Sequence, residues 1–399
     1  MPPRASLEAI SAKGVLDYTP TEKCGSQLEI PALNALALRS LVFLFNEREG
    51  LFSRSVTLGQ DGFHHEGVSP KRTIIALLGL HRLEESGETM PFDMSSMRAV
   101  VLGDTGWVST LGDLGLVTWF TAECEPDRLK NLFNQFDFDS ALDNYSDARK
   151  GHTRALAWFL AGIAHARLSC PRTLPDLTDA AVNTYRLLQD NQSESGIFGH
   201  ATLSAFLSRT FCNRFGTFGD QIHSVYALTT FSRAFQIEEP LASALSCGNA
   251  IRALQGELGQ WWSLYDKRAC RVVNRYPVLS LHQDGTAPVG LLALGEATGQ
   301  SFHESIYKGL LWIRGANELG KDLRSPDRGL IWDSIRLRKR TTNYWEVALS
   351  FMNIPRRPQA EALKIRYEAR PDHFGWLLYA FGRFGLPKPE IAVQADTAQ

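Results

Sequence analysis

Apolar residues recur along this chain with the spacing of α-helices. In the segment Ile74–Leu83 they occupy nearly every position, which is typical of a helix buried on all its faces. Other segments repeat apolar groups every three or four residues, so that one side of each helix is apolar. The pattern therefore predicts a mainly helical protein. The expected helices are Leu33–Phe45, Ile74–Leu83, Leu114–Thr121, Thr153–Ala166, Ala180–Leu188, Ser224–Phe235, Ala242–Leu254, Thr286–Ala297, Ile306–Ala316 and Trp376–Phe384.

Alternating strand patterns are scarce. The best extended candidate is Val272–Leu281, where Pro277 removes a backbone N–H and confines the segment to a loop or a sheet edge. Breaks at prolines such as Pro240 and Pro326 are consistent with helices joined as hairpins. No low-complexity linker divides the chain. We therefore expect one domain over residues 26–385, with a loosely ordered N-terminus at 1–25 and a loose tail at 386–399.

Several helix connections carry a glycine followed by an aromatic residue. Two of them, Gln192–Phe198 and Gln255–Trp261, share the longer frame Gln-x3-Gly-x-aromatic. In this frame the glutamine can hydrogen-bond the backbone at a helix end, the glycine permits a tight turn, and the aromatic ring packs beneath the next unit. Helical units joined by similar turns predict an array whose members bury one another.

The Gln-x3-Gly-x-Trp frame of Gln255–Trp261 resembles the QW repeat of squalene–hopene cyclases, and the Gly-x-Phe-Gly-Asp sequence of Gly216–Asp220 is similar to turns in the β-subunits of protein prenyltransferases. Members of this terpenoid cyclase and prenyltransferase superfamily fold as α/α toroids, with an inner ring of parallel helices inside an outer ring and a pocket at one end. The resemblance therefore implies an all-α, single-domain (α/α)6-type toroid, a barrel of helix hairpins with long loops at the pocket end.

The standard catalytic motifs of those families do not accompany the frames. Squalene–hopene-type cyclases protonate an alkene with an Asp-x-Asp-Asp motif, and the nearest match, Asp137–Ser140, lacks the last carboxylate. The carboxylate-rich metal motifs of other terpene cyclases and the Asp/Cys/His zinc set of prenyltransferases are absent as well. The resemblance thus supports the fold better than the reaction.

Charge and cysteine content narrow the range of partners. The chain has 42 Lys+Arg and 43 Asp+Glu, a net charge of −1, which leaves no broad positive surface for a nucleic-acid backbone. The 6 cysteines are scattered without a Cys-x-x-Cys pair, as in reduced cytosolic proteins. The segment Met1–Ser6 lacks the apolar core of a signal peptide, and no apolar run is long enough to span a bilayer. We expect a cytoplasmic protein with a small-molecule substrate.

The densest group of chemically active side chains is in the segment Gly259–Ala287. Its aromatic rings could stabilise a carbocation or an oxocarbenium-like sugar, and its basic groups could hold a diphosphate or a carboxylate. For Asp284, which precedes an expected helix, plain helix capping is the alternative. The predicted catalytic residues here are Tyr265, Asp266, Tyr276, His282 and Asp284, and the predicted substrate-binding residues are Trp261, Trp262, Lys267, Arg268 and Arg275.

A second candidate site lies at the start of an expected helix. Asp220 and His223 are three residues apart there, and a carboxylate beside an imidazole raises the pKa of the ring and orients it as a general base. The alternative is a capping aspartate with an unrelated histidine. We predict Asp220 and His223 to be catalytic, and Phe218, Tyr226 and Trp332 complete the predicted substrate-binding set.

Asp139, Asp143 and Asp147 recur every four residues, as one stripe on a helix. The stripe could bind Mg²⁺ and through it a diphosphate, and a solvated helix face is the alternative. The histidines of Gln60–Gly67 are adjacent and would point in different directions, which disfavours a metal site. The basic run Arg336–Arg340 is interpreted as a solvated helix end or a site for an anionic group. No phosphate-binding loop, dinucleotide glycine pattern or serine-hydrolase elbow occurs, so no nucleotide or flavin cofactor is expected.

Two enzyme classes and a scaffold fit these features. The first is a terpenoid cyclase that acts on an isoprenyl diphosphate through carbocations in an aromatic-lined pocket. The second is a glycan-active toroid enzyme, a uronate lyase, C5-epimerase or glycosidase, because Tyr265, Tyr276 and His282 loosely resemble the Tyr/His sets that abstract a proton beside a carboxylate. A paired acid and base carboxylate is harder to find, which favours a lyase or epimerase over a glycosidase. The third is a non-enzymatic helical scaffold.

Overall fold

The computed structural model describes residues 15–16, 28–146, 152–171, 176–200, 213–338 and 360–387. Most of the expected N-terminal segment 1–25 and of the tail 386–399 lies outside these ranges, as do Asp147, Lys339 and Arg340. The described part of the basic run is not the expected helix end, because Arg336 lies in a β-strand.

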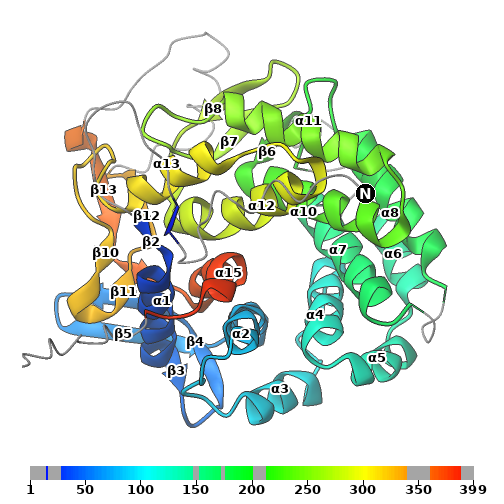
Figure 1. The fold of residues 1–399 in the computed structure, drawn as a ribbon, viewed down its shortest axis with the longest axis horizontal. Coiled ribbons are helices and arrows are strands. Elements are labelled where there is room, and N and C mark those ends of the chain that lie inside the picture. The colour runs from blue at the N-terminus through cyan, green and yellow to red at the C-terminus, as the bar shows by residue number, and fades with distance from the viewer. Residues whose placement is uncertain are drawn as a thin grey trace, which may run out of the picture.

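The helices form two concentric rings, so the expected all-α, single-domain toroid is confirmed (Figure 1). In the described part of the chain the inner ring closes on itself. The helix α7 packs between α4 and α10, the α12 segment packs between α10 and α15, and α15 packs against α2, which contacts α4. The inner helices are α2 (Pro70–Glu85), α4 (Leu111–Cys124), α7 (Thr153–Ser169), α10 (Phe218–Phe235), α12 (Ala287–Thr298) and α15 (Pro371–Phe381).

An outer helix precedes each inner one along the chain and packs around the ring. All ten segments expected from periodicity are helices, and the helix α6 (Phe138–Ser146) lies where the aspartate stripe predicts one, whereas α3 and α5 are not among the expected helices. The helix α5 spans 7 residues, which is too few turns for a clear apolar stripe. The outer helices are α1 (Ile30–Leu44), α3 (Met94–Gly103), α5 (Leu129–Gln135), α6 (Phe138–Ser146), α8 (Thr178–Asn191), α11 (Glu239–Ala253) and α13 (His303–Ile313).

Glycines allow the inner helices to approach closely. A Cβ atom on Gly115 of α4 would overlap the backbone of Phe159 in α7, and one on Gly162 of α7 would overlap the carbonyl of Gly115. The same relation joins α2 to α15, where Gly79 faces the carbonyl of Gly375 and Gly375 faces the carbonyl of Ile75. The contact between α2 and α15 joins the first and last inner helices, so these glycines close the ring.

The two glutamine frames form matching turns, as the sequence predicts. Gln192 Nε2 donates to the carbonyl of Gly196, 2.9 Å, and to that of Ser243 in α11, 2.9 Å. Gln255 Nε2 donates in the same way to Gly259, 3.0 Å, and to Ser305 in α13, 2.9 Å. Both glycines have positive φ angles, 87° and 93°, which favour glycine. Each glutamine therefore closes its own turn and ties its outer helix to the next one.

Short antiparallel sheets lie in the connections that lead into inner helices. The β4–β5 hairpin precedes α2, β6 precedes α10, β9 precedes the α12 segment and β14 precedes α15. The extended segment expected at Val272–Leu281 is two strands, β8 and β9, separated at Pro277. The strands are β1 (Val15–Leu16), β2 (Leu28–Glu29), β3 (Phe45–Asn46), β4 (Leu51–Gly59), β5 (Gly62–Val68), β6 (Phe215–Thr217), β7 (Leu264–Asp266), β8 (Arg271–Asn274), β9 (Val278–Leu279), β10 (Arg324–Ser325), β11 (Leu330–Ile331), β12 (Ser334–Leu337), β13 (Leu363–Arg366) and β14 (Glu368–Ala369).

Candidate active site

The amino ends of the inner helices bring charged and aromatic side chains together. Contacts run between neighbouring helices at this end: Lys71 of α2 pairs with Asp113 of α4, and Trp158 of α7 lies 5.3 Å from His223 of α10, measured between ring centroids. These side chains come from segments far apart in the sequence and meet because neighbouring inner helices pack side by side. We refer to the following residues as the helix-start cluster: Arg154, Trp158, His200, Asp220, His223, His282 and Trp376.

An aspartate–histidine pair stands at the start of α10. Asp220 Oδ2 accepts a hydrogen bond from Thr217 N, 2.8 Å, within a capping box, and lies 2.9 Å from His200 Nδ1. Asp220 is 1% exposed, whereas a third of the His200 side chain is exposed. The hydrogen bond from His200 to the carboxylate raises the pKa of His200. A protonated, oriented and solvent-accessible imidazole can act as a general acid.

An arginine with no carboxylate partner among the described residues stands at the start of α7. Arg154 is exposed, and its guanidinium lies 5.6 Å from the centroid of the Trp158 ring. Among the described residues no aspartate or glutamate forms an ion pair with it. On the same indole, Lys71 Nζ lies 5.0 Å from the centroid, but that charge is matched by Asp113 at 2.5 Å. Arg154 is therefore available for an anionic ligand.

Two imidazoles near Arg154 are held neutral. Burial lowers the pKa of His223 well below its usual value, and the charges of Arg154 and His282 lower it further. Burial, together with Arg370 and Arg154, lowers the pKa of His282 to about 3. Both side chains are partly exposed, so each ring is accessible while it remains unprotonated. A neutral imidazole near a cation can accept a proton from a bound anionic substrate, because the anion offsets the cation.

A buried histidine–aspartate pair holds the segment that carries His282 in place. His373 Nε2 of α15 lies 2.7 Å from Asp284 Oδ1, and both residues are almost fully buried. Burial raises the pKa of Asp284. Asp284 is in the π-helical turn His282–Thr286, so its contact with α15 fixes the segment that carries His282.

The structure gathers one part of the predicted site and separates the rest. Asp220 and His223 lie with His282 and Asp284 at this end of the ring, and the Phe218 ring lies 4.8 Å from the His282 ring. These residues come from both of the segments that the sequence singled out. Their catalytic and binding roles stay predictions.

The predicted residues around Tyr265 lie in the β6–β7–β8 sheet and its turn instead. Tyr265 is fully buried, and its hydroxyl accepts a hydrogen bond from the backbone N–H of Trp262. Asp266 pairs with Arg214 at 2.6 Å, and its other oxygen accepts from the backbone N–H of Arg268. Lys267 donates to the carbonyl of Asn191, and burial lowers its pKa to about 8. These contacts hold the turn against α8.

The remaining predicted aromatic residues also pack within the protein. Arg275 lies over the Trp262 ring at 5.4 Å, and the Tyr276 hydroxyl donates to Glu318, 2.7 Å. The Trp261 ring stacks on Phe218 at 5.2 Å and is fully buried. Trp332 is buried beneath the exposed ring of Tyr367.

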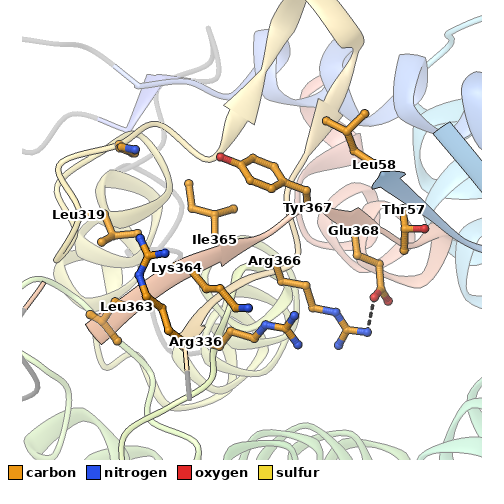
Figure 2. Close-up of a pocket in the computed structure, with 12 residues that line it drawn as sticks. Thr57, Leu58, Leu319, Arg336, Leu363, Lys364, Ile365, Arg366, Tyr367 and Glu368 are labelled. Carbon is orange, nitrogen blue, oxygen red and sulfur yellow. Dashed lines mark ion pairs between the residues drawn. The ribbon is translucent and has the colours of Figure 1, made fainter. Parts of the chain in front are cut away.

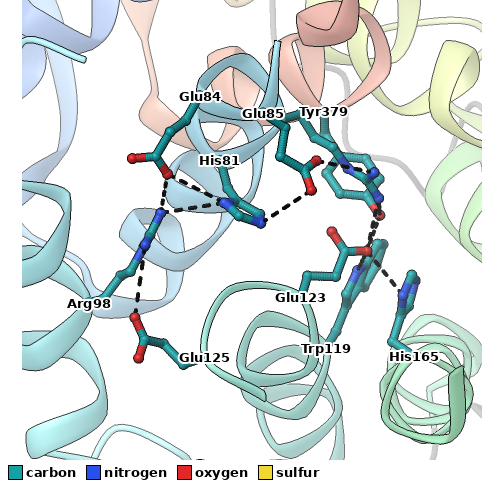
Figure 3. Close-up of polar contacts among 10 residues, drawn as sticks. His81, Glu84, Glu85, Arg98, Trp119, Glu123, Glu125, His165 and Tyr379 are labelled. Carbon is teal, nitrogen blue, oxygen red and sulfur yellow. Dashed lines mark hydrogen bonds and ion pairs between the residues drawn. The ribbon is translucent and has the colours of Figure 1, made fainter. Parts of the chain in front are cut away.

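Tyr226 belongs to a different group, toward the carboxyl ends of the inner helices; its members Trp119, Glu123, His165 and Tyr379 are drawn in Figure 3. The Tyr226 hydroxyl lies 2.9 Å from His165 Nε2 and 2.8 Å from the Tyr379 hydroxyl. Glu123 Oε1 accepts from Tyr379 at 2.6 Å and lies 3.1 Å from Arg82 Nη2. Burial raises the pKa of Glu123, but His165 and Arg82 outweigh it and hold the pKa below its usual value. A cavity of about 710 Å³ lies beside this network.

No metal site was found in the described residues. Asp139 and Asp143 are exposed on the outer helix α6, and the described part of the chain holds no group of three or more metal-ligating side chains. The histidines of Gln60–Gly67 lie on the exposed strand β5. Magnesium binding by the aspartate stripe therefore gains no support from the fold.

Sequence reasoning missed Arg154, Trp158, His200, His373 and Trp376. The first two follow His152 at the beginning of an expected helix, and a basic and an aromatic residue four positions apart on the first turns of a helix could have marked them. The others give no local signal. Their neighbours in space are far away in the sequence.

Asparagine in place of Asp220 is expected to lower the pKa of His200. The neutral amide can still accept the capping hydrogen bonds but no longer favours the imidazolium. His200 then loses its proton at a lower pH, and any activity that needs protonated His200 falls at a lower pH too. A pH titration of the histidine NMR signals measures the shift. His303, whose pKa is lowered by burial alone, is the internal control and stays unchanged.

Comparisons with known proteins were made at three levels. No family model matches the chain, and no curated protein matches it in sequence. Solved structures match over most of its length. A possible member of the GH105 family from Salmonella enterica subsp. enterica serovar Paratyphi A aligns with a TM-score of 0.56 and 12% identity, covering 92% of this chain and 98% of that chain.

Two further solved structures share the fold. A sugar epimerase from a ruminal bacterium aligns with a TM-score of 0.56 and 10% identity, over 89% of this chain and 100% of that chain. An unsaturated glucuronyl hydrolase specific for heparin aligns with a TM-score of 0.50 and 15% identity, over 88% and 95%. At these identities the likeness establishes the α/α toroid.

The first functional expectation, a terpenoid cyclase, is wrong on these findings. The similar structures named above are a possible GH105 member, a sugar epimerase and a glucuronyl hydrolase, and no terpene cyclase is among them. The Gln-x3-Gly-x-aromatic frame joins one outer helix to the next in such a ring. It therefore indicates the fold and does not indicate isoprenoid chemistry. None of the helices in the described part of the chain combines the length and apolar character needed to cross a bilayer.

Proposed function

We propose that this protein is a glycan-active enzyme that moves a proton on an acidic sugar, as a uronate lyase or epimerase does, at the amino end of its inner ring. The observation that carries the proposal is Arg154, an exposed cation without an ion-pair partner among the described residues, beside two neutral imidazoles and the His200–Asp220 pair. The sugar enzymes that share the fold, among them a glucuronyl hydrolase and a sugar epimerase, support this substrate class.

In the proposed reaction the guanidinium of Arg154 binds the carboxylate of a uronate unit. Neutral His223 or His282 removes the proton from the carbon next to that carboxylate, and the electron pair of the broken C–H bond moves into the carboxyl group. The positive ends of the inner helices and Arg154 stabilise the added negative charge. His200, whose pKa is raised by the hydrogen bond to Asp220, then supplies a proton.

Two outcomes share this first step. If the proton returns to the same carbon from the opposite face, the sugar is epimerised. If the bond from the adjacent carbon to its glycosidic oxygen breaks instead, a double bond forms and the leaving oxygen takes the proton from His200. Both outcomes use imidazole as acid and base.

The side chains at this end of the ring fit hydrolysis by a pair of carboxyl groups less well than they fit proton transfer by imidazole. Asp113 and Asp220 are the carboxylates at the starts of α4 and α10, and each caps its helix and is paired with a cation, Lys71 or His200. A glycosidase also needs a carboxylic acid with a raised pKa. Asp284 has a raised pKa but is fully buried.

Thermal unfolding with single sugars tests the substrate class. Glucuronate or galacturonate is expected to raise the Tm, because a ligand that binds only the folded state stabilises it. Glucose and galactose, which have the same rings without the carboxylate, serve as matched controls. An equal shift with acidic and neutral sugars, or none with either, contradicts the proposal.

A further inference from the structure

A basic cavity opens between the sheet of β12 and β13 and the end of β4 (Figure 2). Its volume is about 600 Å³. Its lining includes a single carboxylate, Glu368, which pairs with Arg366. The cations that line it are Lys321, Arg336, Arg338, Lys364 and Arg366.

Like charges stand directly opposite each other in this cavity. Arg336 of β12 is the cross-strand partner of Lys364 in β13, and Arg366 is two residues further along the same face. Figure 2 shows the charged ends of the three side chains on one side of the strands. Opposed like charges destabilise a sheet. Arg336 and Lys364 form no side-chain hydrogen bond or ion pair with any described residue, so the repulsion is not relieved within this part of the protein.

An exposed aromatic ring completes the cavity. Tyr367 is 45% exposed, although most large aromatic side chains of this protein are buried. It packs edge-on against buried Trp332, with ring centroids 5.1 Å apart, which holds the ring in place. Figure 2 shows this ring on the other side of the strand from the charged ends of Lys364 and Arg366, so these cations face a ligand without it. Cations on one face of a strand suit a ligand with several anionic groups, as an acidic sugar chain has.

The cavity lies next to the helix-start cluster along the backbone. Glu368 is in β14, which leads directly into α15, and β9, at the other side of the same sheet as β13, leads into the turn that carries His282. Arg370, between Glu368 and α15, pairs with Asp333 at 2.9 Å and contributes to the low pKa of His282. The two sites therefore share the amino end of the inner ring.

We infer that the basic cavity is a second glycan subsite, which binds acidic units of an oligosaccharide whose reacting unit is held at Arg154. Arg336 and Lys364 bind the carboxylate or sulfate groups of these units. This inference rests on the proposed function and adds that the substrate is a chain of acidic sugars.

Isothermal titration of the full chain with acidic glycans of two lengths tests the inference. The first series compares galacturonate with a chain of six galacturonate units, whose only anionic groups are carboxylates. The second compares heparin-derived disaccharides and octasaccharides, which add sulfates. The variant Arg336→Gln/Lys364→Gln is expected to bind the longer chain of at least one series about tenfold more weakly, because two charge-assisted contacts are lost. Its affinity for galacturonate stays unchanged, and the series that responds identifies the anionic group.

A charge-matched variant controls for net charge. Lys130 and Arg186 are exposed on the outer helices α5 and α8, so Lys130→Gln/Arg186→Gln removes the same charge elsewhere and is expected to bind as the unmodified protein does.

If the cavity variant binds the longer chains normally while the unmodified protein binds both lengths, the subsite is wrong and the proposed function stands. An equal loss for the single sugar and the longer chain also overturns a separate subsite. If the unmodified protein binds no acidic glycan of either series, the proposed function itself fails.

Discussion

Replacing Arg154 with glutamine is expected to lower kcat/KM for an acidic sugar by about 100-fold, on the order of 3 kcal/mol of transition-state stabilisation. Arg154 is the exposed cation of the helix-start cluster with no ion pair to a described carboxylate, so its charge is available to the substrate. Because the carboxyl group gains negative charge as the proton leaves, the loss should appear in kcat as well as in KM. Steady-state kinetics on a uronate oligosaccharide measure both.

Two controls separate this effect from a general disturbance. Arg154→Lys keeps the charge but loses the planar fork, and it is expected to recover part of the activity. Lys71→Gln removes a cation over the same indole ring that is already paired with Asp113, and it is expected to have the smaller effect. Equal losses for Arg154→Gln and Lys71→Gln would contradict the assigned role of Arg154.

Alanine in place of Gly375 is expected to lower the free energy of unfolding by about 2–4 kcal/mol. Its Cβ would overlap the carbonyl of Ile75 in α2, and in return α2 places Gly79 against the carbonyl of Gly375. Both neighbours are backbone atoms of inner helices, so the overlap is relieved only if α2 and α15 move apart. Urea denaturation followed by circular dichroism measures the change.

Gly103 provides the matched control for this substitution. It is a helical glycine in the outer helix α3, and a Cβ there would meet no atom within 4 Å. Gly103→Ala is therefore expected to leave stability unchanged or to raise it slightly, through helix propensity. If both alanine variants unfold at the same urea concentration, the ring is not closed by backbone contact at these glycines.

The ring could be predicted from the sequence because its signals are local. The apolar periodicity of segments such as Thr153–Ala166 marks helices, and the frame at Gln255 marks the turn that ties two outer helices together. The hairpin of β4 and β5 was not predicted. Its second strand is polar and exposed along most of its length, so it shows no alternation of apolar and polar positions.

The site was harder to predict because a segment that contains many reactive residues need not be the place where such residues meet in the folded protein. The segment around Tyr265 contains many reactive side chains, but the turn between β7 and β8 uses them for hydrogen bonds and ion pairs of its own. Asp220 and His282 were found because a capping position and a turn mark helix starts. Arg154 and His200 join them through the packing of α7 against α10 and the contact of His200 with Asp220, which no local pattern reports.

The most direct test of proton transfer by His223 or His282 is isotope exchange at the carbon next to the uronate carboxyl group. Uronate oligosaccharides are incubated with the protein in D₂O, and the products are analysed by mass spectrometry and NMR. We expect deuterium at that carbon, or loss of its hydrogen with formation of a double bond, and we expect neither with the His223→Gln/His282→Gln variant. Cleavage that leaves the carbon-bound hydrogen in place, or exchange that survives in this variant, would contradict proton transfer by these histidines.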